Sequence, residues 1–268
     1  MPYFHLAAYS ESLGSVTDSD VDAALDGVLV RRNNHLIFTD DYNLIAAYGS
    51  STTLTRARFG NAALNQIGNP HIWPLDRSAT ISDLPAVMDF RDTPMELPKN
   101  EELTILATTD AVGPAVADVV IWLATPEWSQ NLPGYRDRLI TRATVVAPAG
   151  AESAWNTAAE VVMERDLYNG VYAVVGASCV AANAIAFRIR FPDQKQVRGK
   201  QHRPGGLVQN ALGAEPWKAQ FRGLGEWGRF HTFTLPEIQF FGDAAGGTYE
   251  VRLDLLYLGE SPSLLYGG

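Results

Sequence analysis

Apolar and polar residues alternate along several segments of the chain, which is the pattern of a half-buried β-strand. In the segment 250–258, EVRLDLLYL, aliphatic residues fall on one face while Arg252 and Asp254 fall on the other. The segments 56–59, RARF, and 187–191, FRIRF, alternate in the same way and carry both arginines on one side. Each of these segments is therefore predicted to be a strand.

The remaining pattern also favours strands over helices. The apolar run 119–124, VVIWLA, is rich in β-branched and aromatic residues, which predicts a strand buried on both faces. Two segments have helical character: 17–28, where Thr17 to Asp20 could cap a short helix, and 150–166, rich in Ala, Glu and Met. The end of 150–166 also fits a strand that leads into Tyr168. Short strands separated by turn residues predict an all-β fold, a sandwich or a barrel, with one or two short helices.

The chain contains an internal repeat, in which the same landmarks recur in the same order about half the chain length apart. They are Tyr42-Asn43 and Tyr168-Asn169, Gly49 and Gly176, Arg56-Ala-Arg58-Phe59 and Arg188-Ile-Arg190-Phe191, Gly68-Asn-Pro70 and Gly213 to Pro216, Leu97-Pro98 and Leu235-Pro236, and Asp110 to Gly113 and Asp243 to Gly246. Single matches are weak evidence, because glycine, proline and asparagine recur in turns. Their shared order indicates a duplicated domain.

The repeat divides the chain into two domains. The segment 125–137 contains proline and glycine and is the predicted connector, which gives a first domain over 1–130 and a second over 131–268. Residues 1–30 precede the repeat and are predicted to form an N-terminal arm. The drift of the repeat offset locates one insertion in the first copy, within 74–90, and one in the second copy, within 192–206.

The charge distribution is uneven. The formal net charge is −9, which argues against wholesale nucleic-acid binding because counterion release rewards basic proteins. Basic residues nevertheless concentrate around the second insertion, against one acidic residue, Asp193: they are Arg188, Arg190, Lys195, Arg198, Lys200 and Arg203. This set is a candidate contact for lipid headgroups, nucleic-acid phosphates or an acidic patch on a neighbouring subunit. A solvated loop that balances local charge is the alternative.

No catalytic, cofactor-binding or metal-binding residue is assigned from the sequence, and the chain is not predicted to be an enzyme. The glycine pattern at 223–228 precedes a strand-like segment and not the helix that a dinucleotide site requires. The five histidines lack metal-ligand spacing, and Cys179, the single cysteine, has no histidine near it in sequence. A pair of carboxylates distant in sequence stays open. The charge-free segment between Asp166 and Arg188 has the length of a membrane span but is predicted to form strands, and no secretory signal is recognised.

Two tandem β domains of about 130 residues, in the repeated order quoted above and with the passage 84–105, resemble the double jelly-roll major capsid proteins of tailless icosahedral viruses. These include membrane-containing phages. The resemblance implies two tandem eight-stranded jelly-roll sandwiches. It also implies homotrimers that act as pseudo-hexagonal tiles of a viral shell.

The resemblance further implies a set of partners and a location. The partners are neighbouring capsomers, penton or minor capsid proteins and, as an open alternative, an internal lipid membrane, with no sequence-specific nucleic acid. The location is the virion, with assembly in the host cytoplasm. Large aromatic residues are candidates for core or subunit contacts, and at least one terminus is predicted to dock on a neighbouring subunit or face a membrane. The aromatic candidates are Trp122, Trp128, Trp217, Trp227, Phe240 and Phe241.

Other functions fit the same pattern. A minor capsid or receptor-binding protein could also contain two β domains. A soluble carbohydrate-binding protein or enzyme would be marked by clustered exposed aromatic residues and paired carboxylates. A pore-forming or membrane-surface protein would be marked by the charge-free segment and the basic loop.

Overall fold

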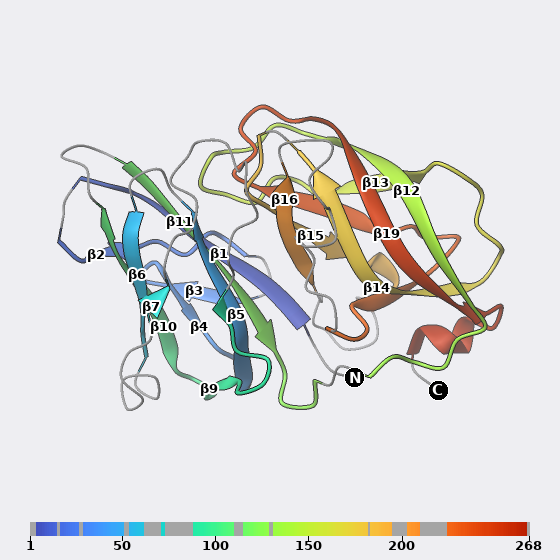
Figure 1. The fold of residues 1–268 in the computed structure, drawn as a ribbon, viewed down its shortest axis with the longest axis horizontal. Helices are drawn as coiled ribbons and strands as arrows, with labels where there is room; N and C mark the ends of the chain where they lie inside the picture. The colour runs from blue at the N-terminus through green and yellow to red at the C-terminus, as the bar shows by residue number, and fades with distance from the viewer. Residues whose placement is uncertain are drawn as a thin grey trace. The chain divides into compact units, whose positions relative to one another are not determined.

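The computed structural model describes residues 4–14, 17–26, 29–50, 54–61, 71–72, 88–109, 115–128, 131–181, 183–194, 203–209 and 224–266. They form two compact units (Figure 1). The N-terminal unit runs from Leu6 to Pro126, and the C-terminal unit comprises Glu127 onwards together with Phe4 and His5. The division after Pro126 lies within the connector 125–137 that the sequence suggests, four residues before the boundary expected at 130.

The N-terminal unit consists of two sheets. One has the order β1-β11-β5-β8, with β9 paired to β5, and the other has the order β3-β4-β10-β6-β7, with β2 paired to β10. The strands are β1 (Phe4–Leu13), β2 (Ser19–Val21), β3 (Val30–Arg32), β4 (His35–Ile37), β5 (Tyr42–Ser50), β6 (Leu54–Gly60), β7 (His71–Ile72), β8 (Met88–Asp89), β9 (Met95–Leu97), β10 (Glu102–Thr109) and β11 (Ala115–Ala124).

Side chains from both sheets share one core, so the N-terminal unit is a sandwich. Tyr9, Leu44 and Ile121 reach this core from one sheet, and Phe59 and Ile105 reach it from the other. Along β10, buried residues alternate with partly exposed ones, as the period of two requires for a half-buried strand. Residues 119–124 of β11 are all fully buried, which confirms the prediction of a strand buried on both faces.

The C-terminal unit is a single sheet that closes on itself. Its strand order is β16-β15-β18-β13-β12-β19-β14-β17, and β16 also pairs with β14 in parallel, which joins seven of these strands into a ring. The elements are β12 (Asp137–Ala147), β13 (Ala159–Met163), β14 (Val171–Val180), β15 (Ala186–Arg190), the 3₁₀ helix η1 (Pro192–Gln194), β16 (Gly205–Gln209), β17 (Gly228–His231), β18 (Glu237–Phe241), β19 (Gly247–Gly259) and the 3₁₀ helix η2 (Pro262–Tyr266).

Both ends of the described chain are tied into the C-terminal unit. Phe4 packs against Trp227, with ring centroids 6.0 Å apart, and His5 forms a parallel bridge with Arg203. Leu265 of η2 joins a small apolar cluster on β14 and β19. Residues 4 and 5 were expected in an arm of the first domain, so this placement could not be read from their position in the sequence.

The two units repeat the same nested strand pairing. In each, the first strand pairs with the eighth, the second with the seventh, the third with the sixth and the fourth with the fifth. In the N-terminal unit, β8 and β9 both pair with β5 and together take the place of the sixth strand, so the pairs are β1–β11, β2–β10, β5 with β8 and β9, and β6–β7. In the C-terminal unit the pairs are β12–β19, β13–β18, β14–β17 and β15–β16. The hairpin β3–β4 is an addition to the N-terminal unit.

The Arg-x-Arg-Phe motifs occupy equivalent places in this pairing. Arg56 lies opposite Thr108 on β10, and Arg188 lies opposite Gln239 on β18. The second arginine of each motif lies two residues further along the same strand pair. The Arg-x-Arg-Phe motif therefore marks the same register in both units.

The predicted helices are wrong. Ser19 to Val21 form a strand that pairs with β10, and Ala23 bridges to Tyr9, so the described part of 17–28 is extended. In 150–166 the last part is the strand β13, which is the alternative that leads into Tyr168. The charge-free segment before Arg188 contains β14 and the start of β15, which confirms the strand interpretation. Among the described residues, no helix has the length and apolar character needed to cross a membrane.

Candidate interaction surfaces

The first arginine pair, Arg56 and Arg58, binds one carboxylate in the N-terminal unit. Arg56 Nη2 lies 3.1 Å from Asp18 Oδ1, and Arg58 Nη2 lies 2.6 Å from Asp18 Oδ2. Thr108 Oγ1 also donates a hydrogen bond to Asp18. The hydrogen bond from Thr108, together with the two guanidinium groups, holds the pKa of the Asp18 carboxyl below its usual value. Asp18 precedes β2, so the cluster ties β2, β10 and β6 together.

Replacing Asp18 by asparagine is expected to destabilise the N-terminal unit by about 1 kcal/mol at neutral pH, because a partly exposed charge pair is screened by water. Since the folded state lowers the pKa of Asp18, its contribution is present above the unfolded pKa and is lost as pH falls through the folded pKa. The stability difference between wild type and D18N should therefore shrink below about pH 4.

Guanidinium unfolding at pH 7 and at lower pH measures this difference. D20N, which changes an exposed neighbour on β2, is the control and should lie within about 0.5 kcal/mol of wild type. A D18N variant as stable as D20N at pH 7 would contradict the assigned role.

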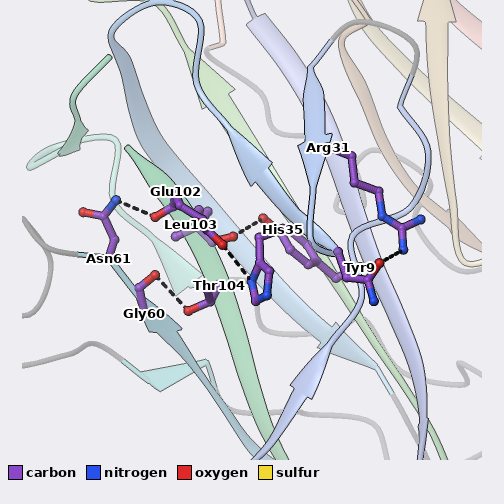
Figure 2. Close-up of polar contacts among 9 residues, drawn as sticks. Tyr9, Arg31, His35, Gly60, Asn61, Glu102, Leu103 and Thr104 are labelled. Carbon is purple, nitrogen blue, oxygen red and sulfur yellow. Dashed lines mark hydrogen bonds and ion pairs between the residues drawn. The ribbon is translucent and has the colours of Figure 1, made fainter. Parts of the chain in front are cut away.

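Polar side chains fix the added hairpin β3–β4 to the rest of the N-terminal unit (Figure 2). Asn33 and Asn34 have positive φ angles of 49° and 69°, which is the conformation of a two-residue type I′ hairpin turn. His35 Nδ1 lies 3.6 Å from Glu102 Oε1 on β10, and Arg31 Nη2 lies 3.2 Å from Asp22 Oδ2, next to β2.

Further hydrogen bonds join neighbouring strands beside this hairpin (Figure 2). Tyr9 donates its hydroxyl hydrogen to the Leu103 carbonyl at 3.0 Å, and burial raises the pKa of Tyr9 well above its ordinary value. Asn61 Nδ2 donates to the Glu102 carbonyl at 3.0 Å. These groups hold neighbouring strands together and do not converge on a common point where a ligand could react.

The basic set predicted as a contact loop does not form one surface in the described part of the chain. The Arg188 side chain is 0% exposed, its guanidinium carbon lies 4.0 Å from the centroid of the Trp155 ring, and its Nε donates to Gln239 Oε1 at 3.1 Å. Arg190 Nη1 lies 3.3 Å from Glu237 Oε2, and Arg203 is buried. Lys195, Arg198 and Lys200 lie outside the described residues, so contact with phosphate, lipid or another subunit stays a prediction.

The arginines of the two motifs act in a similar way. In each unit, arginine side chains on the fourth strand of the nested order, β6 or β15, contact a residue that precedes the second strand, β2 or β13. Arg56 and Arg58 contact Asp18, and Arg188 contacts Trp155. The seventh strand of the nested order, β10 or β18, contributes a hydrogen-bonding residue to each contact: Thr108 donates to Asp18, and Gln239 accepts from Arg188. The motif is therefore a structural clamp within each unit.

Most of the large aromatic candidates belong to the core. Trp122, Trp227, Phe240 and Phe241 are buried, whereas Trp128 is partly buried and donates its indole hydrogen to the Leu224 carbonyl at 2.9 Å. Trp217 lies outside the described residues. A role for any of these aromatic residues in subunit contacts stays a prediction.

The exposed aromatic side chains are ones that sequence reasoning missed. Tyr168 was a landmark of the repeat, yet it is 79% exposed while its counterpart Tyr42 is 6% exposed. Phe233 lies in the turn between β17 and β18 and is also exposed. In the sequence, their exposure is indicated by an aromatic residue within a polar turn. This indication is weak because single exposed aromatic residues are common.

The groups that could react or bind a metal do not form a site within the described residues. Burial raises the pKa of the Cys179 thiol well above its ordinary value, so the thiol is protonated at neutral pH and is a small buried apolar side chain. Within the described ranges, no three His, Cys, Asp or Glu side chains lie together in a way that could hold a metal ion. Gly228 begins the strand β17, so the glycine pattern leads into a strand as expected.

Comparison with known proteins gives little additional information. No protein-family model matches the chain, and no curated protein matches its sequence. Among solved structures, the chain is similar to the major capsid protein P2 of bacteriophage PM2, with 9% sequence identity, 98% of this chain and 99% of that chain covered, and a TM-score of 0.22. A TM-score of this size supports no conclusion about function, which must be inferred from the chain's own topology and surfaces.

Proposed function

We propose that this chain is the major capsid protein of an icosahedral virus and that each of its two units is a jelly roll. The observation that carries this proposal is the nested strand pairing, which occurs twice in one chain. A jelly roll is a long antiparallel hairpin of eight strands rolled into two sheets, so its strands pair first with eighth and inward to fourth with fifth. Both units follow this order, with the hairpin β3–β4 and the parallel pairing of β14 with β16 as local additions.

The duplication has a geometric use in a shell. A trimer of a duplicated domain presents six similar units around its axis, which gives a pseudo-hexagonal tile from a single gene product. The two copies are then free to diverge and make different contacts. Features found in one copy alone support this division of roles: the hairpin β3–β4 in the N-terminal unit and the basic insertion 192–206 in the C-terminal unit.

The proposal includes partners and a location. The partners are copies of the same chain in the homotrimer and in neighbouring capsomers, penton or minor capsid proteins, and an internal lipid membrane in a membrane-containing particle. The chain would act in the virion after assembly in the host cytoplasm. Its net charge of −9 does not favour sequence-independent binding to a packaged genome. No catalytic role is part of the proposal.

Self-association tests the proposal directly. The purified chain has a mass of 29.2 kDa, and light scattering is expected to give three times that mass or the mass of a closed shell. Negative-stain microscopy should show trimers or shells in the same sample. A monodisperse monomer at all concentrations would exclude the capsid function. A trimer that is a minor component of purified particles on a stained gel would instead favour a vertex or receptor-binding protein.

A further inference from the structure

The most exposed aromatic side chains of the described residues all belong to one end of the C-terminal unit. These four residues, here called the aromatic rim, are Tyr135 (50% exposed), Tyr168 (79%), Phe233 (84%) and Tyr266 (49%). The other strongly exposed apolar side chains of the described residues are aliphatic. Such segregation is unlike the scattered single exposed residues that are normal on protein surfaces.

Strand register brings the four residues to the same end of the sheet. Asp137 at the start of β12 pairs with Tyr257 near the end of β19, and Val171 at the start of β14 pairs with both Gly259 and His231. These pairings place the strand ends beside one another, and η2, red in Figure 1, lies next to the end of β19. Tyr135, Tyr168 and Phe233 lie two or three residues from one of these ends, and Tyr266 follows Leu265, which shares an apolar cluster with Val171 and Leu258.

Hydrogen bonds hold the loop that carries Tyr168 in place. The backbone of Gly170 and that of Thr232 face each other: Thr232 N donates to Gly170 O at 3.0 Å, and Gly170 N donates to Thr232 Oγ1 at 3.2 Å. Tyr257 donates its hydroxyl hydrogen to the Asn169 carbonyl at 3.2 Å. Gly170 has a φ of +146°, and a Cβ there would lie 2.6 Å from the Gly259 carbonyl oxygen, so the close approach requires glycine.

The loop that carries Phe233 is held in the same manner. The Phe233 ring stacks on the His231 ring with centroids 4.5 Å apart, and Phe233 N donates to His231 Nδ1 at 3.3 Å. The adjacent Thr232 Oγ1 donates to Asn169 Oδ1 at 3.2 Å. Both aromatic side chains are therefore presented by loops that hydrogen bonds within the unit hold in place, which reduces the entropic cost of association.

The charges near the rim indicate the kind of partner. Exposed acidic and basic side chains are mixed in the segments that carry the rim: they are Asp137, Glu164, Asp166 and Glu260, and Arg136, Arg138 and Arg165. A surface of this kind lacks the excess of lysine and arginine that attracts anionic lipid headgroups or phosphates. Aromatic residues are instead enriched at protein interfaces, where charged residues lie mainly at the rim.

The size of the rim points in the same direction. Four neighbouring strands span about 15 Å, which is wider than a small ligand. An aromatic side chain buries about 150–250 Å² when it is covered, so the exposed parts of the four rings offer roughly 500 Å². A standard protein interface needs about 800 Å² on each side, and the rim alone would supply more than half of it.

We propose that the aromatic rim is the surface by which the C-terminal unit binds a second copy of this chain, with Phe233 and Tyr168 as its central contacts. This inference rests on the proposed self-assembly and names the residues responsible for it. Aromatic residues of this kind dominate binding energy when they insert into a partner surface.

The test compares assembly of the wild-type chain with that of the double variant Phe233→Ser, Tyr168→Ser. Loss of two central aromatic contacts is expected to weaken self-association about 100-fold or more in sedimentation analysis. The control is the double variant Val146→Ser, Val162→Ser, which changes exposed aliphatic residues of β12 and β13 in the same unit and should stay within about 3-fold of wild type. Circular dichroism and melting temperatures establish that all three chains fold alike, as expected for exposed positions.

The outcomes separate this inference from the proposed function. If the wild-type chain and the rim variant assemble equally well, the rim proposal is overturned and the capsid proposal stands. A wild-type chain that stays monomeric overturns both. Equal loss of assembly in the rim variant and the control also overturns a specific role of the rim.

Hydroxyl-radical labelling of the unmodified chain provides a second measurement that needs no variant. Tyr168 and Phe233 should be protected in the assembled sample and labelled in the dilute one, and equal labelling in both overturns the proposal. Binding to neutral glycans that is lost in the rim variant, while assembly is unchanged, would assign the rim to a glycan and overturn the assignment to a second copy.

Discussion

Replacing Arg188 by alanine is expected to destabilise the C-terminal unit by about 3 kcal/mol, although a surface arginine can usually be removed at little cost. The Arg188 side chain is fully buried, so its loss leaves a cavity beside Trp155. The amide oxygen of Gln239 also loses its donor, while Gln239 Nε2 stays bonded to the Asn156 carbonyl at 2.9 Å. Removal of a buried charge offsets part of this loss.

Arg190 provides the matched control, because it belongs to the same strand and the same motif. Its ion pair with Glu237 is partly exposed, so Arg190→Ala should cost at most about 1 kcal/mol. Guanidinium unfolding followed by tryptophan fluorescence measures both variants. Equal losses of stability in R188A and R190A would show that the burial of Arg188 against Trp155 has no energetic weight.

Replacing Gly205 by alanine is expected to lower the melting temperature of the C-terminal unit by about 10 °C, which corresponds to about 3 kcal/mol for a unit of this size. A Cβ at residue 205 would lie 2.0 Å from the Phe187 carbonyl oxygen and 2.7 Å from Arg188 Cα. Both are backbone atoms, so β16 must move away from β15. Since β16 pairs with β15 and with β14, this shift opens the ring of strands.

Gly134→Ala is the control for this variant. No atom lies within 4 Å of a Cβ built at residue 134, which is in the same unit, so G134A should unfold within about 2 °C of wild type. Differential scanning calorimetry of both variants measures the difference. A G205A variant that melts with G134A would mean that the close approach of β15 and β16 is not required.

The sequence predicted the strands well because their side-chain pattern is local. The alternation in 250–258 and in the two Arg-x-Arg-Phe segments requires only that one face of each strand is buried. The order of the repeated landmarks also predicted a duplication, and Arg56 and Arg188 lie at equivalent places in the strand pairing of the two units. Side-chain alternation and the order of the landmarks are therefore sufficient to predict tandem β units from the sequence.

The predictions of helices at 17–28 and 150–166 are wrong because contacts between residues distant in sequence override local helix propensity. Backbone bonds from Ser10 N to Asp22 O at 2.8 Å and from Ala24 N to Ala8 O at 2.9 Å hold the first segment extended against β1. In the second segment, Asn156 N donates to the Phe240 carbonyl at 2.9 Å. Neither set of partners can be recognised from residues within the segment.

The candidate surfaces were harder to predict than the fold. A period of two places Arg188 and Arg190 on the same side of one strand, and the sequence gives both the same role. Only the position of Trp155, more than thirty residues earlier, buries one of them and leaves the other in a partly exposed ion pair. In the described structure, the arginines of the basic set therefore contact different residues and do not form one surface.

The sequence by itself determined the strand content and the order of the repeated landmarks, because each is encoded by side-chain period or by the order of turn residues. The tertiary structure alone decided the nested pairing, the closure of the C-terminal sheet and the exposure of Tyr168 and Phe233. The physical reason is that pairing and burial depend on backbone and side-chain partners far apart in the chain. Tyr42 and Tyr168 are matched landmarks of the repeat, yet Tyr42 begins strand β5 and is buried, whereas Tyr168 lies in the loop before β14 and is exposed.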